Sequence, residues 1–281
     1  MNETLKKLRS ALRPIYGDRE TEAIIRIIFH YVKGWSVTDM IIHDGEPLSD
    51  MVKERIDKIL QRLLRHEPIQ YITGEAPFHG LLLHVTPATL IPRPETSELV
   101  DIITDDAGDR SDLRVLDIAT GSGCIAIALA RSLKFPEVEA LEISGEALKV
   151  AEENAKALKA DVRFIHADIF KWDAAPDSLD IIVSNPPYVD ESEKKAMEPN
   201  VLDYEPAQAL FVPDDNPLVY YKRIADVAAE GLTPGGKLYL EINPLHADDL
   251  KRLLERKGFE NVDIIRDSYE KNRFIRCNRP S

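Results

Sequence analysis

The sequence contains only two cysteines, Cys124 and Cys277, which lie far apart and form no CxxC spacing. Two isolated cysteines provide neither a disulfide framework nor a cysteine-based zinc site. The seven histidines are scattered as well, without the spacing of metal ligands. We therefore expect a protein of a reducing compartment that holds no metal.

Long apolar runs are absent too. Residues 1–7 (MNETLKK) contain no apolar signal core, and no stretch approaches the roughly 18 uninterrupted apolar residues of a membrane-spanning helix. These features predict a cytoplasmic protein without a membrane partner.

Basic residues are outnumbered by acidic ones, with 36 Lys and Arg against 49 Asp and Glu. A surface with this average charge repels a phosphate backbone unless a local basic patch overrides it, so we expect no direct binding of nucleic acid. The apolar share of 44%, in contrast, is ordinary for a globular chain, and 281 residues suffice for one large domain and a small one.

The apolar pattern of the amino-terminal part is helical. Apolar residues recur at helical spacing from about Leu5 to Leu64, Gly17 and Gly34 punctuate the runs, and Ser49 is a plausible N-cap for the run that begins at Val52. The pattern predicts a small helical bundle over residues 1–67. From 68 to 94 the runs are short, at 70–72 and 81–85 around a turn-like His79-Gly80, which predicts a β-hairpin linker.

Residues 95–281 alternate buried-looking strands with amphipathic helices. This alternation predicts an α/β domain with a mostly parallel sheet and helices on both faces. The expected strands are 113–118, 138–143, 162–166, 179–184, 237–242, 262–265 and 274–277.

The first of these strands leads into a glycine-containing turn, residues 117–123 (DIATGSG), before a helical run at 124–133. Glycines at such a turn let the backbone approach a ligand and direct its amide N–H groups toward it. Only a GxG is present, because position 126 is Ala. Taken alone, this motif is equally compatible with a tight structural turn.

Three acidic residues favour the cofactor interpretation. Glu142 ends the second strand, where a carboxylate can accept hydrogen bonds from both ribose hydroxyls, and Asp168 follows the third strand, where it can accept from an adenine amino group. Asp117 precedes the glycines and suits a cationic ammonium better than a phosphate. Together they predict S-adenosylmethionine, bound by Asp117, Ala119, Thr120, Gly121, Ser122, Gly123, Glu142, Asp168, Ile169 and Asn185.

The fourth strand ends in Asn185-Pro186-Pro187-Tyr188. Prolines cannot continue a strand, so the chain must turn outward at the carboxyl edge of the sheet, beside the cofactor. The side-chain oxygen of Asn185 and the backbone oxygen of Pro186 can both accept from a planar NH2 group, and Tyr188 offers an aromatic face. We predict Asn185, Pro186 and Tyr188 as the catalytic residues for methylation of an amide or an exocyclic base amine.

A conjugated nitrogen of this kind needs no strong base before it attacks the methyl group. Its methylated, protonated form is very acidic and loses a proton after the transfer, which leaves S-adenosylhomocysteine as the second product. Catalysis would come from orientation, electrostatics and the sulfonium leaving group.

These motifs resemble the PrmC/HemK family of glutamine-N5 methyltransferases, which act on peptide chain release factors. The resemblance covers nearly the whole chain and rests on residues 90–96 (LIPRPET), 117–123, 185–188 (NPPY), 204–206 (YEP) and 209–210. The NPPY element is shared with adenine-N6 methyltransferases, so the segment around Arg93 is the discriminating one.

The resemblance implies a seven-stranded Rossmann-like class I methyltransferase sheet whose last strand is antiparallel, within a domain spanning residues 95–281. It also implies that the amino-terminal domain docks the release factor, whose Gly-Gly-Gln loop enters the pocket. The implied substrate-binding residues are Asn185, Pro186, Pro187, Tyr188, Arg93 and Glu95. The sequence departs from the family at Glu142 and Ala119, where the family usually has Asp and Gly, and near Asp168, where Ile169 and Phe170 replace the usual aromatic contact to adenine.

Three alternatives remain open. An adenine-N6 methyltransferase would use the Asn185 pocket equally well, although the acidic balance and the lack of a basic recognition segment speak against it. Methylation of a ribosomal protein glutamine is the second, and a sensor that binds S-adenosylmethionine without turnover is the third. Residues 189–217 form a polar stretch too long for an idle connector, which predicts a mobile substrate-facing lid.

Overall fold

The computed structural model describes residues 1–281, which fold into two compact units. The amino-terminal unit contains residues 1–74 together with 198–204, and the larger unit contains 75–197 and 205–281. The division into domains at 1–67, 68–94 and 95–281 stays a prediction. No helix in the structure combines the length and apolar character needed to cross a membrane.

The amino-terminal unit is helical, as predicted. Its helices are α1 (Asn2–Lys33), α2 (Val37–Ile42), α3 (Asp50–Leu63), α4 (Ile69–Thr73) and α8 (Pro199–Leu202). Gly17 interrupts the helical backbone of α1 with a φ of 69°, and Gly34 ends that helix in the left-handed conformation. Ser49 caps α3 by accepting from the Val52 N–H, as its position predicts.

One local prediction in this unit is wrong. Residues 70–72 were expected to be extended but lie in α4, whose first turn forms when the Pro68 carbonyl accepts from the N–H groups of Tyr71 and Ile72. Burial of Ile69 and Ile72 in the helical core stabilises this short helix, and Gly74 ends it in the left-handed conformation. A three-residue apolar run does not distinguish a strand from a helical turn.

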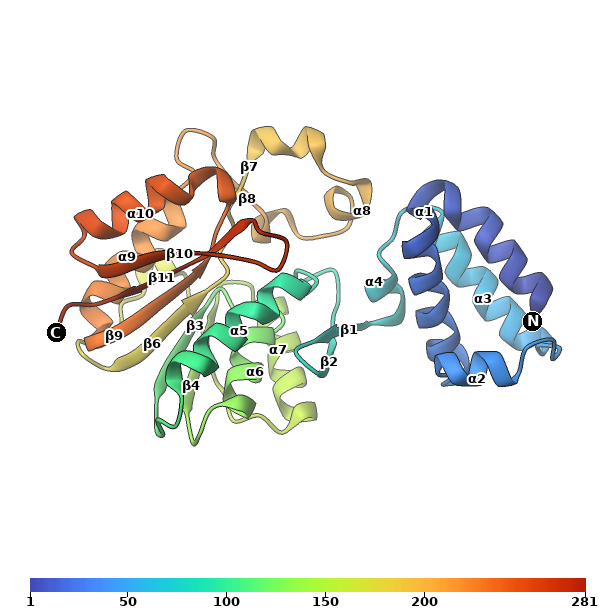
Figure 1. Cartoon of the computed structure of the whole chain (residues 1–281), viewed down its shortest axis with the longest axis horizontal. Helices are drawn as coiled ribbons and strands as arrows, with labels where there is room; N and C mark the ends of the chain where they lie inside the picture. The colour runs from blue at the N-terminus through green and yellow to red at the C-terminus, as the bar shows by residue number, and fades with distance from the viewer. The chain divides into compact units, whose positions relative to one another are not determined.

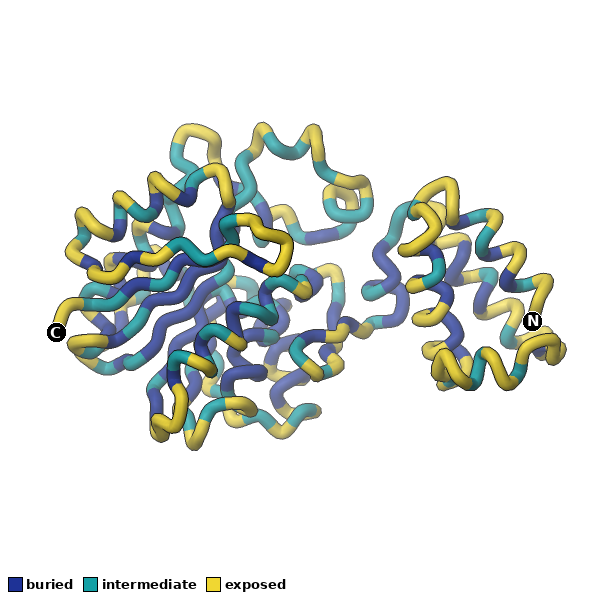
Figure 2. The backbone as a smooth tube through the Cα atoms, in the orientation of Figure 1, coloured by how far each residue is buried: buried dark blue, intermediate teal, exposed yellow.

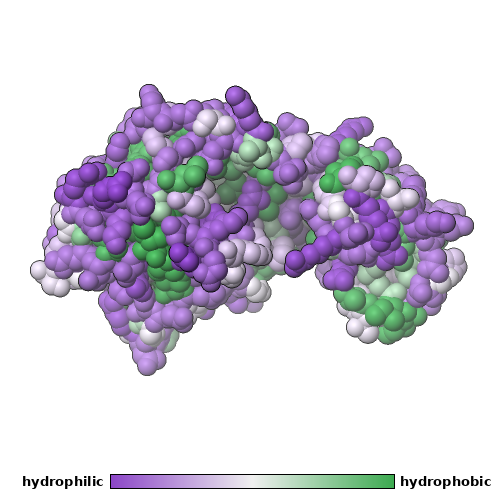
Figure 3. All heavy atoms as spheres, turned by 45° about the horizontal axis from the view of Figure 1, so that its top comes forward, coloured by the Kyte–Doolittle hydropathy of each residue, from purple (hydrophilic) through white to green (hydrophobic).

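Helix α2 leaves an apolar surface exposed. None of its residues is buried, and Ile41 and Ile42 are 72% and 67% exposed. A hydrophobic patch is visible on the amino-terminal unit in the space-filling view (Figure 3). Exposed apolar side chains gathered in this way are typical of a surface that contacts another molecule.

The larger unit is built on a seven-stranded sheet in the order β10-β11-β9-β6-β3-β4-β5 (Figure 1). Only β11 is antiparallel to its neighbours, as the family resemblance implied. The strands are β3 (Arg114–Ile118), β4 (Glu137–Glu142), β5 (Arg163–His166), β6 (Leu179–Ser184), β9 (Leu232–Glu241), β10 (Glu260–Arg266) and β11 (Asn272–Asn278). All seven predicted strands are present, and β9 begins earlier than expected because Leu232 already pairs with Leu179.

Helices cover both faces of this sheet, and the strands between them are buried (Figure 2). One face carries α5 (Pro94–Ala107), α6 (Cys124–Ser132) and α7 (Gly145–Leu158), and the other carries α9 (Val219–Gly231) and α10 (Ala247–Arg256). The predicted hairpin, β1 (Glu75–Phe78) and β2 (Leu81–His84), packs on the first face, where Asn154 of α7 accepts from the His84 N–H and donates to its carbonyl. The predicted fold class is therefore confirmed.

The position of the site follows from the strand order. Strand β3 lies between β4 and β6, and the strand order reverses at this point. The connections on the two sides of β3 therefore run in opposite directions, which opens a crevice at its carboxyl end. In the stretch 189–217, β7 (Val189–Asp190) pairs in parallel with β8 (Phe211–Val212). Short 3-10 turns at Glu191–Ala196 and Ala207–Ala209 lie between the two strands.

Candidate active site

A cavity of about 160 Å³ opens at the carboxyl edge of the sheet, within the larger unit. Its walls come from the turns that follow β3, β4, β5 and β6, together with residues of the segments 88–96 and 206–209. The sequence motifs thus converge on one place. The predicted site residues in its wall are Arg93, Ala119, Thr120, Gly121, Ser122, Glu142, Asp168, Ile169, Asn185, Pro186 and Pro187.

The turn after β3 requires its two glycines. Gly121 and Gly123 have φ values of 57° and 82°, in the left-handed region that glycine adopts without strain. A Cβ at Gly123 would lie 3.0 Å from Ile127 Cδ1 and 3.1 Å from the Ala151 Cβ. Gly123 therefore lets α6 begin at the cavity, although this glycine lies behind the wall and does not line it.

Glu142 fastens this turn to the next one. Its Oε2 accepts from the Gly121 N–H and its Oε1 accepts from the Ser144 N–H, both at 2.9 Å. Glu142 is only 7% exposed yet lines the cavity, and each carboxylate oxygen retains a lone pair. It can thus hold the loop and accept from a ligand hydroxyl at the same time.

Asp117, which was predicted to bind the cofactor, lies beneath the turn and does not line the cavity. It is fully buried, and its Oδ2 accepts from the Thr120 hydroxyl at 2.6 Å and from the Ala126 N–H at 3.2 Å. Its Oδ1 has no hydrogen-bond partner. Burial raises the pKa of Asp117 to about 7. The turn thus contains a buried carboxyl oxygen that lacks a donor.

We expect the raised pKa of Asp117 to make the folded protein less stable as the pH rises. A carboxyl whose pKa is higher in the folded than in the unfolded chain stabilises the fold fully below pH 4, and this contribution is lost as the pH rises to about 7. Between pH 5 and pH 8 the free energy of unfolding of the wild type should fall by about 2.5 kcal/mol more than that of Asp117→Asn. Urea unfolding of the cofactor-free protein at both pH values measures the difference, and parallel curves would contradict the assignment.

Aromatic residues close one end of the cavity. Asp168 caps the short turn Ile169–Lys171 by accepting from the Phe170 N–H, and Ile169 and Phe170 both line the cavity. The Phe170 ring is 45% exposed and lies 5.2 Å, between centroids, from the ring of Tyr220 on α9. Tyr220 also lines the cavity, and the sequence analysis did not identify it because α9 has an ordinary amphipathic pattern.

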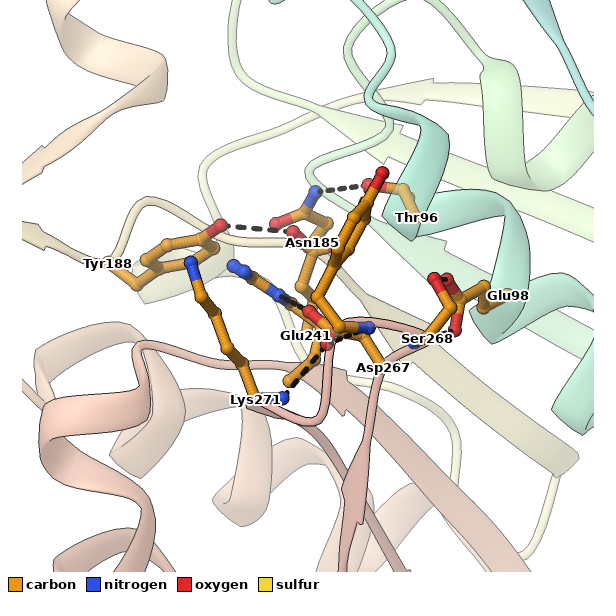
Figure 4. A network of polar contacts seen from close by, with 10 residues as sticks. Thr96, Glu98, Asn185, Tyr188, Glu241, Asp267, Ser268 and Lys271 are labelled. Atoms are coloured by element: carbon orange, nitrogen blue, oxygen red, sulfur yellow. Dashed lines mark hydrogen bonds and ion pairs between the residues drawn. The ribbon is translucent and has the colours of Figure 1, made fainter.

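The Asn-Pro-Pro-Tyr element turns away from β6 as predicted. Asn185, Pro186 and Pro187 line the cavity, but Tyr188 does not. The Tyr188 hydroxyl donates to Oε1 of the buried Glu241 at 3.0 Å (Figure 4), and burial raises the pKa of this tyrosine above its ordinary value. Tyr188 therefore supports the element from behind, and its expected contact with the substrate stays a prediction.

Arg93 is held by an ion pair that fixes the cavity wall. Its Nη2 lies 2.6 Å from Oε1 of Glu205, whose side chain is 1% exposed, and Oε2 of Glu205 accepts from the Ile91 N–H at 3.1 Å. Glu205 precedes the wall residue Pro206, so this pair ties together two motifs that the family resemblance singled out. Glu95 does not line the cavity, and its contact with the substrate stays a prediction. The structure contains no cluster of His, Cys, Asp or Glu suited to a metal.

Two family models match the chain. The methyltransferase small domain matches residues 96–203, and the PrmC N-terminal domain matches residues 3–74. Among solved structures, a methyltransferase from Pyrococcus furiosus superimposes with a TM-score of 0.52 and 19% identity, and covers 72% of this chain and 90% of that protein. This likeness supports the fold.

Curated relatives match at full length. The release factor glutamine methyltransferase of Bacteroides thetaiotaomicron is 45% identical over 280 residues, which cover 99% of this chain and 100% of that protein. The protein of the same name from Flavobacterium psychrophilum is 40% identical over 274 residues, with 95% of each chain covered. The chain therefore belongs to the release factor glutamine methyltransferase family.

Proposed function

We propose that the chain transfers a methyl group from S-adenosylmethionine to the side-chain amide nitrogen (N5) of the glutamine in the Gly-Gly-Gln loop of a peptide chain release factor. The names of the full-length relatives support the substrate. The observation that carries the chemistry is the position of Asn185 and Pro186, which line the cavity beside the glycine turn. Both present oxygen atoms that can accept from a planar NH2 group.

The residues around the cavity fit S-adenosylmethionine. The unpartnered Oδ1 of Asp117 can accept from the ammonium of the methionine moiety once the turn adjusts around it, and the lone pairs left on Glu142 suit the ribose hydroxyls. Asp168 offers an acceptor to the adenine amino group, while Phe170 and Tyr220 offer aromatic surface. This donor and acceptor set is suited to an amino-acid nucleoside.

The protein's part in the reaction is orientation. The cofactor supplies a methyl group on a sulfonium sulfur. The sulfur leaves as a neutral thioether, so it needs no assistance from an acid. Asn185 and Pro186 would hold both amide protons so that the nitrogen lone pair faces this methyl group, and the walls around Pro187 and Pro206 would exclude water. The methylated amide loses its extra proton afterwards, so no buried base is needed.

A protein substrate agrees with the surface of the chain better than a nucleic acid does. The formal net charge is −13, which opposes a phosphate backbone. The exposed apolar side chains of α2 offer a surface suited to the body of a release factor. A ribosomal protein glutamine is the second candidate substrate, since the pocket would hold its amide in the same way. Release factors act on ribosomes, so we place the chain in the cytoplasm.

The proposal is tested by locating the added methyl group. The chain is incubated with S-adenosylmethionine and an unmethylated release factor, the same factor with its loop glutamine replaced by Ala, or unmethylated DNA, and the products are analysed by tandem mass spectrometry. We expect one methyl group on the loop glutamine and none on the Ala variant or the DNA. Methyl on adenine alone would overturn the substrate, and cofactor binding with no transfer to any of them would favour a sensor.

The proposed lid has fixed ends. Asp190 contacts His246 with Nε2 to Oδ2 at 2.8 Å, and Glu193 Oε2 accepts from Asn243 at 2.7 Å, while Glu205 is paired with Arg93. We therefore expect slow amide hydrogen exchange at 205–212 and faster exchange at 194–204. A Gly-Gly-Gln peptide should slow exchange only in the latter range. Slow exchange in 194–204 that the peptide leaves unchanged would rule out a lid.

A further inference from the structure

The Asn185 amide has one polar side-chain partner, Thr96, which also belongs to the cavity wall. Its Nδ2 lies 3.4 Å from Oγ1 of Thr96, at the start of α5, which is a long hydrogen bond (Figure 4). Thr96 is 2% exposed and lies next to Glu95 in the segment that discriminates the family. The direction of this contact decides which end of the Asn185 amide faces the cavity.

The single proton of the Thr96 hydroxyl is already used in a hydrogen bond to Glu241. Thr96 Oγ1 donates to Oε2 of Glu241 at 2.7 Å, and the Tyr188 hydroxyl donates to Oε1 of the same carboxylate at 3.0 Å. A hydroxyl has one proton and two lone pairs, so Thr96 can only accept from Asn185. Asn185 must therefore turn its NH2 toward Thr96 and leave its oxygen for the cavity.

Glu241 can act in this way because its surroundings hold it in place. It ends β9, is 1% exposed, and its two oxygens accept from two different hydroxyls, as an ionised carboxylate does. The guanidinium of Arg273, itself paired with Asp267 at 3.0 Å, favours that charge. Burial raises the pKa of Glu241, and the two hydroxyls and Arg273 oppose this effect.

We propose that Thr96 and Glu241 are positioning residues that fix the amide of Asn185 with its oxygen toward the substrate NH2 group. The inference rests on the proposed function and deepens it by naming what sets the orientation of the acceptor. An inverted Asn185 would present NH2 to the NH2 of the substrate, two donors that repel each other. The Thr96 and Glu241 side chains act through Asn185 and need not contact the substrate.

The Glu241→Gln variant tests the direction of the hydrogen bonds from Thr96 to Glu241 and from Asn185 to Thr96. Its amide has only one acceptor oxygen, so it cannot accept from both Thr96 and Tyr188, and when its NH2 faces Thr96 the Thr96 proton is free to turn toward Asn185. Thr96→Val removes the acceptor with little change in shape. For both variants we expect kcat on a release factor to fall about 10- to 100-fold, with the Kd for S-adenosylhomocysteine within about twofold of the wild type.

Two further variants separate positioning from folding. Thr96→Ser keeps the hydroxyl and should restore kcat to within a fewfold of the wild type. Thr104→Val makes the same change on the same helix, where the hydroxyl bonds only to backbone carbonyls of Val100 and Asp101, and should leave kcat unchanged. Equal loss in Thr96→Val and Thr96→Ser, or full activity in both Thr96→Val and Glu241→Gln, would overturn the proposal.

The orientation of the Asn185 side-chain amide can also be followed by NMR in the absence of catalytic turnover. In protein labelled with 15N-asparagine, the side-chain NH2 resonances of Asn185 are assigned by their loss in Asn185→Ala. We expect them to shift in Thr96→Val and Glu241→Gln but to stay in place in Thr104→Val. If the wild type transferred no methyl to a release factor, the proposed function would fail. Unchanged resonances in Thr96→Val and Glu241→Gln would instead refute the proposal that Thr96 and Glu241 position the Asn185 amide.

Discussion

The Asn185→Ala variant should lose methyl transfer by about 10²- to 10³-fold while it still binds the cofactor. Asn185 lines the cavity and would supply one of the two acceptors for the substrate amide, so its removal lets the nitrogen rotate away from the methyl group. The glycine turn and Glu142, which hold the other end of the cavity, do not bond to Asn185. Single-turnover rates with a release factor, and calorimetry with S-adenosylhomocysteine, measure the two properties separately.

Asn2→Ala serves as the matched control, because this exposed residue belongs to the amino-terminal unit and is distant in sequence from every motif of the cavity. Its rate and affinity should equal those of the wild type. A transfer rate in Asn185→Ala within a fewfold of the wild type would refute the proposed chemistry. Loss of cofactor affinity equal to the loss of rate would instead make Asn185 a cofactor residue.

Glu142→Gln should weaken binding of S-adenosylmethionine by about 10- to 100-fold. The carboxylate accepts from the N–H groups of Gly121 and Ser144, and it would accept from two ribose hydroxyls as well. A glutamine has one acceptor oxygen, so its NH2 would face one N–H group and one hydroxyl without accepting from either. The lost charge-assisted hydrogen bond to a ribose hydroxyl corresponds to roughly 1.5 to 3 kcal/mol.

Glu146→Gln controls for the loss of charge, because this exposed residue lies only four positions away in the first turn of α7. Its affinity for the cofactor should match the wild type in calorimetry. Because Glu142 also fastens the loop, Glu142→Gln should lower the unfolding temperature of the cofactor-free protein as well. Unchanged affinity in Glu142→Gln would mean that the ribose is held elsewhere.

The sequence predicted the sheet well because its strands are short apolar runs bounded by turns. Strand β6 occupies the residues expected for it, 179–184, and the Asn-Pro-Pro-Tyr element leaves its carboxyl end toward the cavity. Proline fixes that outcome locally, since neither Pro186 nor Pro187 can donate to a neighbouring strand. The resemblance to the PrmC/HemK family is confirmed by relatives that match at full length.

Other parts of the site depend on contacts between residues far apart in the sequence. Thr96 and Glu241 are 145 positions apart, and Ile91 and Glu205 are 114 apart, so neither hydrogen bond has a local signature. The position of Asp117 below the turn could not be predicted either, because the same residue type suits a buried acceptor and a ligand contact. Tyr188 was assigned to the substrate by its aromatic ring, whereas its hydroxyl is drawn to Glu241.

The most direct test of the account is a crystal structure of the chain with S-adenosylhomocysteine and a Gly-Gly-Gln peptide. We predict that the amide nitrogen of the peptide glutamine lies within hydrogen-bond distance of Asn185 Oδ1 and of the Pro186 carbonyl oxygen, with Thr96 still bonded to Asn185 Nδ2. A glutamine amide bound outside the cavity, or one that offers its oxygen to Asn185 Nδ2, would contradict the account.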